Sequence, residues 1–121
     1  MADSRESIAA AAERAVSYLE EISPEMRGCA ILDAEGGGLA ASGDPGAWAE
    51  AGGELLAAAD GAAGEPAAHA HVATEEGEAF AVRQDGLVAV AVTDRFALAS
   101  LMLFDLRVAL RDVLVQAAAA V

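Results

Sequence analysis

The sequence contains no lysine, so all seven of its basic residues other than histidine are arginines. Without lysine, a chain cannot form a phosphate-binding loop of the Gly-x-x-x-x-Gly-Lys-Ser/Thr type, a Schiff base or a lysine general base. This absence excludes a P-loop NTPase and the Schiff-base enzymes.

Cysteine and long hydrophobic runs are also scarce. Cys29 is the single cysteine, so no internal disulfide can form, and its place in an apolar run is typical of a buried thiol in a reducing compartment. The longest apolar run, residues 96–104, is far shorter than the roughly 20 residues that cross a bilayer, and no apolar segment follows a basic start. We therefore expect a cytoplasmic protein that does not insert into a membrane.

Positive charge is outweighed by twenty acidic residues, which give a formal net charge of −13. Such a field repels phosphate backbones and anionic lipids, so we expect neither nucleic acid nor a membrane surface as a partner. Hydrophobic residues make up 55% of the 121-residue chain. We expect one domain over residues 1–121, ordered over about residues 4–115, that folds without a disulfide, metal or other cofactor.

A β-hairpin is predicted in the first half of the chain. Two short apolar runs, residues 29–32 and 39–41, flank a connection over residues 33–38 that contains three glycines. Glycine adopts positive φ without steric cost, so this connection is typical of a hairpin turn.

The patterns around the hairpin set the order of the other elements. Asp44-Pro45 indicates a helix start, with a capping carboxylate and a proline at the first helical position. Apolar periodicity predicts a helix over residues 3–22, a helix ending at about residue 60, strands over residues 69–74, 78–83 and 87–93, and a last helix over residues 96–114. The predicted class is α+β with the order αββαβββα.

Alternation in the last three strands predicts two unlike faces of a sheet. One face would carry the bulky residues Val72, Phe80, Val82, Val88, Val90 and Val92. The other would carry Arg83 and the small residues Ala79, Ala81, Ala89 and Ala91. Because both faces are apolar, we expect helices on both. The last helix is apolar around nearly its whole circumference up to Leu106, which predicts burial on several sides.

The second helix has an apolar stripe that should face inward: Trp48, Ala51, Gly52, Leu55, Leu56 and Ala59. Glu50 and Glu54 fall on its outer face. Glycine inside a helix costs about 1 kcal/mol relative to alanine. Gly52 is therefore either tolerated in an alanine-rich helix or permits close approach of another helix or a sheet.

These elements together resemble the roadblock / dynein light-chain family over essentially the whole chain. The sequence similarity is most specific in three segments: Ala-Ile-Leu-Asp at residues 30–33, Leu-Ala-Ala-Ser-Gly at residues 39–43 and Glu-Ala-Phe-Ala-Val-Arg at residues 78–83. The resemblance implies a roadblock / profilin-like fold, in which a five-stranded antiparallel sheet has the order 2-1-5-4-3. The first and last helices would cover the bulky face and the second helix the alanine face.

The resemblance also implies a homodimer in which the third strands pair and the second helices pack side by side. The sequence offers its own reason, because residues 69–74 would form an edge strand without proline, lysine or glycine to blunt it. Bacterial proteins of this kind commonly partner Ras-like small GTPases. The resemblance therefore implies a non-enzymatic dimeric adaptor that docks such a GTPase and influences its nucleotide cycle or localisation. The candidate dimer or partner residues are Trp48, Glu50, Gly52, Glu54, Leu55, Leu56, His69, His71 and Thr74.

The two histidines of the edge strand permit two interpretations. His69 and His71 share a face at a spacing that can chelate a metal, and twofold pairing would bring four imidazoles together. No further ligand pattern lies nearby, so we predict no metal site and favour titration. Protonation below about pH 6.5 would place like charges near one another across a dimer and weaken it.

Two other side chains also have a structural and a functional interpretation. Arg83 could pair with Glu78 or Asp85, which we favour, or could bind a carboxylate or phosphate of a partner. Trp48 could be a core or self-dimer contact, which we favour, or an anchor for another protein.

No catalytic motif is present, so we predict no catalytic residues. Ser42 lacks the Gly-x-Ser-x-Gly context of a nucleophile elbow. The acidic pairs at residues 20–21 and 75–76 are typical of solvated surface. The alternative to an adaptor is a small-ligand, pH-sensing or scaffold module without a GTPase partner. Such a module could have a pocket under the second helix unless Trp48, Leu55 and Leu56 fill that face.

Overall fold

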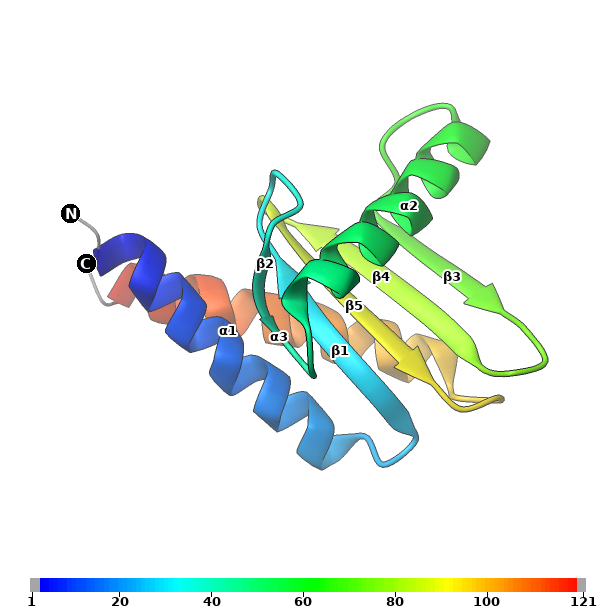
Figure 1. Cartoon of the computed structure of the whole chain (residues 1–121), viewed down its shortest axis with the longest axis horizontal. Coiled ribbons are helices and arrows are strands. Elements are labelled where there is room, and N and C mark those ends of the chain that lie inside the picture. Colours follow the sequence, from blue (N-terminus) through cyan, green and yellow to red (C-terminus); the bar gives the residue numbers. More distant parts are fainter. Residues whose placement is uncertain (1–2, 120–121) are drawn as a thin grey trace.

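The computed structural model describes residues 3–119, which form three helices and five strands (Figure 1). In chain order the elements are α1 (Asp3–Ile22), β1 (Met26–Leu32), β2 (Gly38–Ala41), α2 (Pro45–Ala63), β3 (His69–Ala73), β4 (Glu78–Gln84), β5 (Leu87–Thr93) and α3 (Ala99–Ala119). All strand pairs are antiparallel and the sheet order is β2-β1-β5-β4-β3. The predicted class, element order and sheet order are therefore confirmed.

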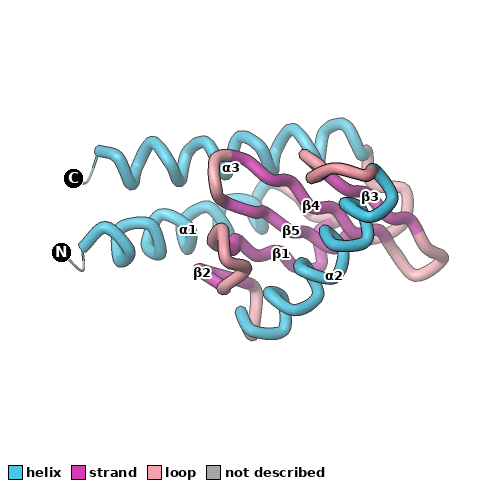
Figure 2. Tube along the Cα trace, turned by 90° about the horizontal axis from the view of Figure 1, so that it is seen from above, coloured by secondary structure: helices cyan, strands magenta, loops and turns pink. Residues whose placement is uncertain are grey.

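The sheet is the middle of three layers (Figure 2). α1 and α3 lie side by side against one face, where the larger apolar cluster includes Leu19, Ile31, Phe80, Leu106 and Leu110. α2 covers the other face with a smaller cluster that includes Ala30, Leu32, Leu56, Ala81 and Val90. Burial of these two clusters provides most of the driving force for folding.

The predicted division of the sheet into a bulky and a small face is wrong. Residues directly opposite each other in an antiparallel pair share a face, and Phe80 lies opposite Ala91 while Ala81 lies opposite Val90. Each face therefore combines large and small side chains. The α1/α3 face has Phe80, Val82, Ala89 and Ala91, and the α2 face has Ala81, Val88 and Val90.

α2 starts as predicted but ends later. The Asp44 side chain accepts a hydrogen bond of 3.0 Å from a backbone N–H of the first turn, which begins with Pro45. The helix stops at Gly64, whose φ of 76° is left-handed and whose N–H donates to the Asp60 carbonyl at 2.9 Å. Gly64 is thus the terminating glycine, and the helix continues past the predicted end through Gly61.

α3 begins at Ala99, three residues after the predicted start. Phe96 has a φ of 65°, a left-handed conformation that cannot continue a right-handed helix. The Leu98 carbonyl accepts the N–H of Met102 at 3.0 Å and so begins the first turn.

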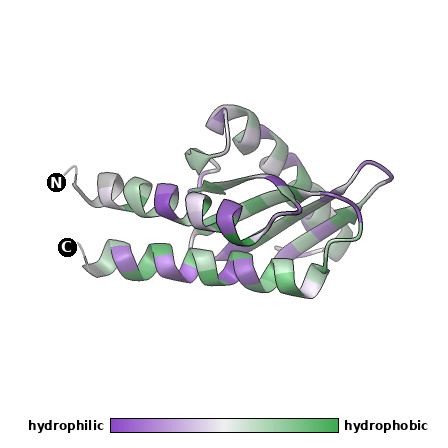
Figure 3. Ribbon diagram, turned by 90° about the horizontal axis from the view of Figure 1, so that it is seen from below, coloured by the Kyte–Doolittle hydropathy of each residue, from purple (hydrophilic) through white to green (hydrophobic). Residues whose placement is uncertain are grey.

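One side of α3 is exposed, which contradicts the predicted burial on several sides. Met102, Leu106 and Leu110 are buried against the sheet and α1. Four large apolar residues at and before the first turns are exposed by 50% or more: Phe96, Leu98, Leu101 and Phe104. Figure 3 shows hydrophobic stretches along this helix. Within the described residues, no helix has the length and apolar character that a membrane span requires.

Candidate interaction surface

β3 forms an edge of the sheet, and its paired neighbour among the described strands is β4. Backbone bonds join the Ala68 carbonyl to β4 at 2.9 Å and the Thr74 N–H to the β3–β4 turn at 2.8 Å. In an antiparallel pair, alternate residues direct their backbone groups to the neighbouring strand. The intervening residues, His69, His71 and Ala73, therefore direct their N–H and C=O groups to the open edge.

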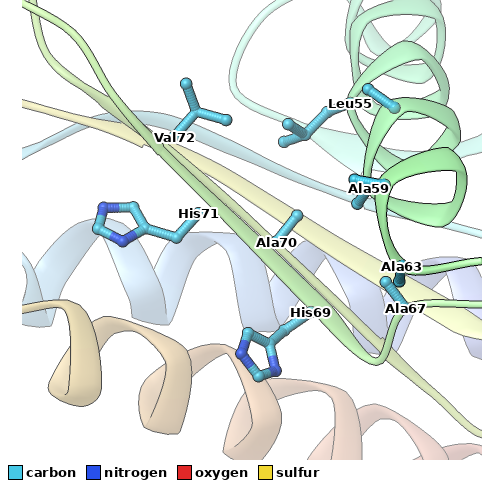
Figure 4. A pocket seen from close by; sticks show the side chains of 10 residues that line it. Leu55, Ala59, Ala63, Ala67, His69, Ala70, His71 and Val72 are labelled. Atoms are coloured by element: carbon cyan, nitrogen blue, oxygen red, sulfur yellow. The ribbon is translucent and has the colours of Figure 1, made fainter.

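The side chains of β3 alternate between the two sides of the sheet (Figure 4). Ala70 and Val72 point toward α2, while His69 and His71 point to the side where α3 lies. The two histidines thus share a face, as their spacing predicted. That face is opposite the one covered by α2.

His71 is held by two neighbours. Its ring stacks on Phe80 with centroids 4.3 Å apart and planes 7° from parallel. Its Nε2 lies 2.6 Å from Oε1 of Glu78, which is buried, and Oε2 of Glu78 accepts the N–H of Ala97 at 3.0 Å. The hydrogen bond with His71, assisted by backbone N–H groups, holds the pKa of Glu78 below its usual value against the opposing effect of desolvation. Glu78 therefore links β3 to the loop before α3.

His69 and Thr74 have different surroundings. Nδ1 of His69 lies 3.5 Å from the guanidinium of Arg107 on α3. The Thr74 hydroxyl donates to the Gly77 carbonyl at 2.9 Å and accepts the N–H groups of Glu76 and Gly77, so it stabilises the β3–β4 turn. In the part of the chain that the structure describes, no group of three or more His, Cys, Asp or Glu residues is arranged to hold a metal ion.

Two of the candidate residues on α2 belong to the core. Gly52 and Leu56 are buried against the sheet. A Cβ atom on Gly52 would lie 3.0 Å from Cγ2 of Val90 and 3.1 Å from Cδ1 of Leu32. Gly52 therefore lets α2 approach the sheet closely, which is the second of its two interpretations.

Trp48 anchors the first turns of α2 to the sheet. Its indole Nε1 donates to the Ser42 carbonyl at 2.8 Å. Its ring covers Gly28 of β1, where an added Cβ would lie 2.8 Å from Cζ2 of the indole. Trp48 is partly buried in the α2-side cluster, so it contributes to the core.

The remaining α2 candidates lie toward solvent. Glu50 and Glu54 are exposed and Leu55 is half-buried. Ala51 is also exposed, although it was predicted to face inward. The outer side of α2 thus combines two carboxylates with small side chains.

A shallow groove runs between α2 and β3 (Figure 4). Its lining includes Leu55, Ala59, Ala63, Ala67, Ala70 and Val72. Val72 is 43% exposed, although it lies beside the α2-side core. The groove therefore forms a mostly apolar surface that continues to the open edge of β3.

Arg83 pairs with Asp60 and not, as predicted, with Glu78 or Asp85. Its guanidinium donates to the two Asp60 oxygens at 2.7 and 2.9 Å and to the Ala67 carbonyl at 3.1 Å. Alternation places Arg83 and Glu78 on opposite faces of β4, so only Arg83 can reach the end of α2. The Arg83 hydrogen bond, aided by the N–H of Ala67, lowers the pKa of Asp60 from 3.8 to about 2.

Sequence reasoning missed Asp60 and the small residues on the β3 side of α2. From the sequence, Asp60 is expected only to lie near the end of the second helix, because a carboxylate at that position does not indicate which residue it will pair with. Leu55, Ala58 and Ala62 recur at helical spacing, and this stripe beside the glutamates could have indicated a second exposed apolar side.

Comparisons with protein-family models and with curated proteins find no match to this sequence. Solved structures do match. A Roadblock/LC7 domain from Streptomyces avermitilis superposes with a TM-score of 0.71 at 17% identity, covering 84% of this chain and 92% of that one. The gliding protein MglB from Thermus thermophilus gives 0.65 at 21% identity, covering 86% and 88%. An MglB structure with a tetrameric arrangement gives 0.64 at 20% identity, covering 93% of each chain.

These similarities extend over most of both chains. Structural similarity at such low sequence identity establishes the fold and leaves the activity to be argued from the surface. The chain therefore has the roadblock/LC7 fold.

Proposed function

We propose that this chain is a non-enzymatic, cytoplasmic homodimeric adaptor that docks a Ras-like small GTPase and influences its nucleotide cycle or localisation. The observation that carries the proposal is the open edge of β3 beside the small-residue side of α2. An unblunted edge is a template for pairing with another strand. Small side chains allow two helices to approach closely.

In the proposed dimer, the β3 strands of two copies pair about a twofold axis. The backbone groups of His69, His71 and Ala73 supply the hydrogen bonds of this pairing. The α2 helices of the two copies then lie next to each other and cover the groove that contains Leu55 and Val72. Covering these partly exposed side chains favours association through the hydrophobic effect.

The paired α2 helices form the proposed docking surface for the GTPase. Glu50 and Glu54 are exposed in the single chain, and in the proposed dimer they would stay accessible on this surface. The adaptor supplies no phosphate-binding loop of the Gly-x-x-x-x-Gly-Lys-Ser/Thr type, because it lacks lysine. The GTPase brings its own nucleotide and magnesium, as the resemblance to bacterial roadblock proteins implies.

Affinity capture with purified protein as bait tests this function, run in parallel with a non-hydrolysable GTP analogue and with GDP. We expect capture of a GTP-binding protein of roughly 20 kDa in one nucleotide state, since a regulator must distinguish the two states. The bait E50R/E54R should lose this capture while its mass in solution stays dimeric. The matched control E13R/E21R, which reverses two exposed charges on α1, should retain it.

The same experiment separates the adaptor from a small-ligand module. Leu56 and Trp48 both pack in the cluster under α2. One groove remains at the β3 edge, where a second copy would cover it, and a smaller one of about 230 Å³ lies on the other side of α2, lined in part by Gly53 and Leu56. If the protein is dimeric but captures no GTP-binding protein in either nucleotide state, the GTPase proposal is overturned and the proposed dimer is not.

A further inference from the structure

The cations of this acidic protein are unevenly distributed. Among the arginines whose side chains the structure describes, Arg27 and Arg83 pair with aspartates and Arg14 binds the amide of Gln116. Arg95, Arg107 and Arg111 form no ion pair with any carboxylate of the described residues. All three belong to α3 or to the loop before it.

The same segment presents four large apolar side chains that are exposed by 50% or more within ten residues of one another. Phe96 is 84% exposed, Leu98 65%, Leu101 50% and Phe104 59%. The guanidinium of Arg95 lies 4.6 Å from the centre of the Phe96 ring. We call the three arginines and these four apolar residues the α3 surface. Exposed apolar groups gathered in this way commonly mark an interaction site.

The charges of α3 are separated around the helix. At about 100° per residue, Arg107 and Arg111 fall on the side toward β3, where Arg107 contacts His69. Asp105 and Asp112 fall on the side toward α1, where Asp112 borders a groove with Arg14 and Tyr18. Phe104 lies between the two sides, next to the arginines. The basic side is thus separate from the acidic side and borders Phe104, whereas Leu101, four residues before Asp105, lies next to the acidic side.

This arrangement does not suit a second copy of the chain. In an antiparallel twofold pairing of α3, the basic side would meet the basic side and the acidic side the acidic side. In a parallel pairing, the basic side of one copy would face the acidic side of the other, but Arg111, which lies next to Phe104 around the helix, would meet its twofold mate. Nucleic acid and anionic membranes carry the charge that Arg107 and Arg111 attract, but both would present an extended array of negative charge to a chain with a net charge of −13. A single helix can instead confine its few carboxylates to the two arginines.

We propose that the α3 surface binds an acidic amphipathic helix of a partner protein. Its apolar residues would cover Leu101 and Phe104, and carboxylates one turn apart would pair with Arg107 and Arg111. The stretch from Leu101 to Arg111 is about 15 Å long, which matches roughly three turns of a partner helix. The site lies on the α1/α3 side of the sheet, opposite α2, so it does not depend on the proposed GTPase function.

A designed 18-residue helical peptide, labelled with a fluorophore, serves as the probe. It has Leu and Phe on one face and glutamates one turn apart beside them, and a matched peptide has glutamine in place of each glutamate. Fluorescence anisotropy with the full chain should show binding of the glutamate peptide at least about tenfold tighter than the glutamine peptide. Raising the salt concentration should reduce this difference.

Variants assign the binding to the α3 surface. R107E/R111E should weaken binding of the glutamate peptide at least about tenfold, and a peptide with lysine at the same positions should bind this variant best. R14E, with one reversed charge on α1, should remain within about twofold of wild type. F104A, which keeps every charge, should also weaken binding of the glutamate peptide. Circular dichroism of each variant establishes that it is folded.

Three results would overturn the proposal. The glutamate and glutamine peptides could bind equally, the R107E/R111E variant could bind as tightly as wild type, or the wild-type chain could bind neither peptide. Sedimentation that shows F104A abolishing self-association would instead assign the α3 surface to a second copy. None of these results bears on capture of a GTPase through α2.

Discussion

At the scale of single residues, Gly52 and Gly53 are neighbours on α2 with opposite surroundings. An added Cβ on Gly53 meets nothing within 4 Å, whereas one on Gly52 would lie 3.0 Å from Val90. Both substitutions to alanine gain about 0.5 to 1 kcal/mol in helix propensity. At Gly52 this gain is offset by displacement of α2 from the sheet.

We therefore expect G53A to raise the free energy of unfolding by about 0.5 to 1 kcal/mol, measured by urea denaturation. G52A should be no more stable than wild type, and G52V should be clearly less stable because a β-branched side chain cannot fit between α2 and Val90. Equal stabilisation by G52A and G53A would contradict the close packing of α2 on the sheet.

The ion pair between Asp60 and Arg83 predicts how stability depends on pH. Because the Asp60 pKa falls from 3.8 to about 2 on folding, its contribution to stability is present above the unfolded value and is lost as the pH falls toward the folded value. We expect wild type to lose stability between about pH 4 and pH 2 more steeply than D60N. The measurement is the thermal midpoint across this range.

A control separates this effect from the general response of an acidic protein to acid. E54Q removes one exposed carboxylate from the same helix and should keep the steep wild-type profile. D60N should also be less stable than wild type at pH 7, because Arg83 loses a charged partner. Parallel profiles for wild type and D60N would show that the pair does not contribute.

At the scale of elements, the sequence patterns were sufficient to predict the existence and order of the eight described elements. They were not sufficient to predict which side chains of neighbouring strands share a face of the sheet. Asp85 and Gly86 both have positive φ, 49° and 84°, and form a two-residue turn that places Gln84 opposite Leu87. This turn determines which residues of β5 lie opposite which residues of β4, and therefore which of them share a face of the sheet. Alternation shows which residues of one strand share a face, but it does not show which residues of the neighbouring strand share that face. For this reason the predicted face of the β5 valines is wrong.

The candidate site was predictable to a similar extent. An edge strand without blunting residues and a helix with outward glutamates could be read from residues 69–74 and from Glu50 and Glu54. The burial of Gly52 and Leu56 and the use of Thr74 inside a turn depend on tertiary contacts. The start of α3 was misplaced because the left-handed conformation of Phe96 is unusual for an aromatic residue and has no local signal.

The open edge of β3 leads to a prediction for this element. The N–H of Ala73 points away from β4, so A73P removes a donor from the edge and leaves the β3–β4 bonds in place. We expect A73P to be folded but monomeric at concentrations where wild type is dimeric, measured by sedimentation velocity. A73T keeps the N–H and favours a strand, so it should remain dimeric. A dimeric A73P would contradict pairing through β3.

At the scale of the whole molecule, net charge opposes the proposed dimer while the interface itself is largely uncharged. Each copy carries −13, and the proposed contacts are backbone hydrogen bonds of β3 and small or apolar side chains of α2. Coulombic repulsion between the copies is screened by salt over about 10 Å at 0.1 M. Raising the salt concentration should therefore strengthen the dimer and weaken the binding of an acidic helix to the α3 surface.

We expect the dissociation constant of the dimer to fall as NaCl rises from about 20 mM to about 500 mM, because repulsion is screened while the apolar contacts persist. Sedimentation velocity over a concentration series measures it, with A73P as the control that should stay monomeric throughout. Binding of the glutamate peptide to the α3 surface should weaken over the same range. A dimer that dissociates as salt rises would instead indicate an interface held by ion pairs, and Glu50 and Glu54 would then be the first groups to test for a role between the two copies.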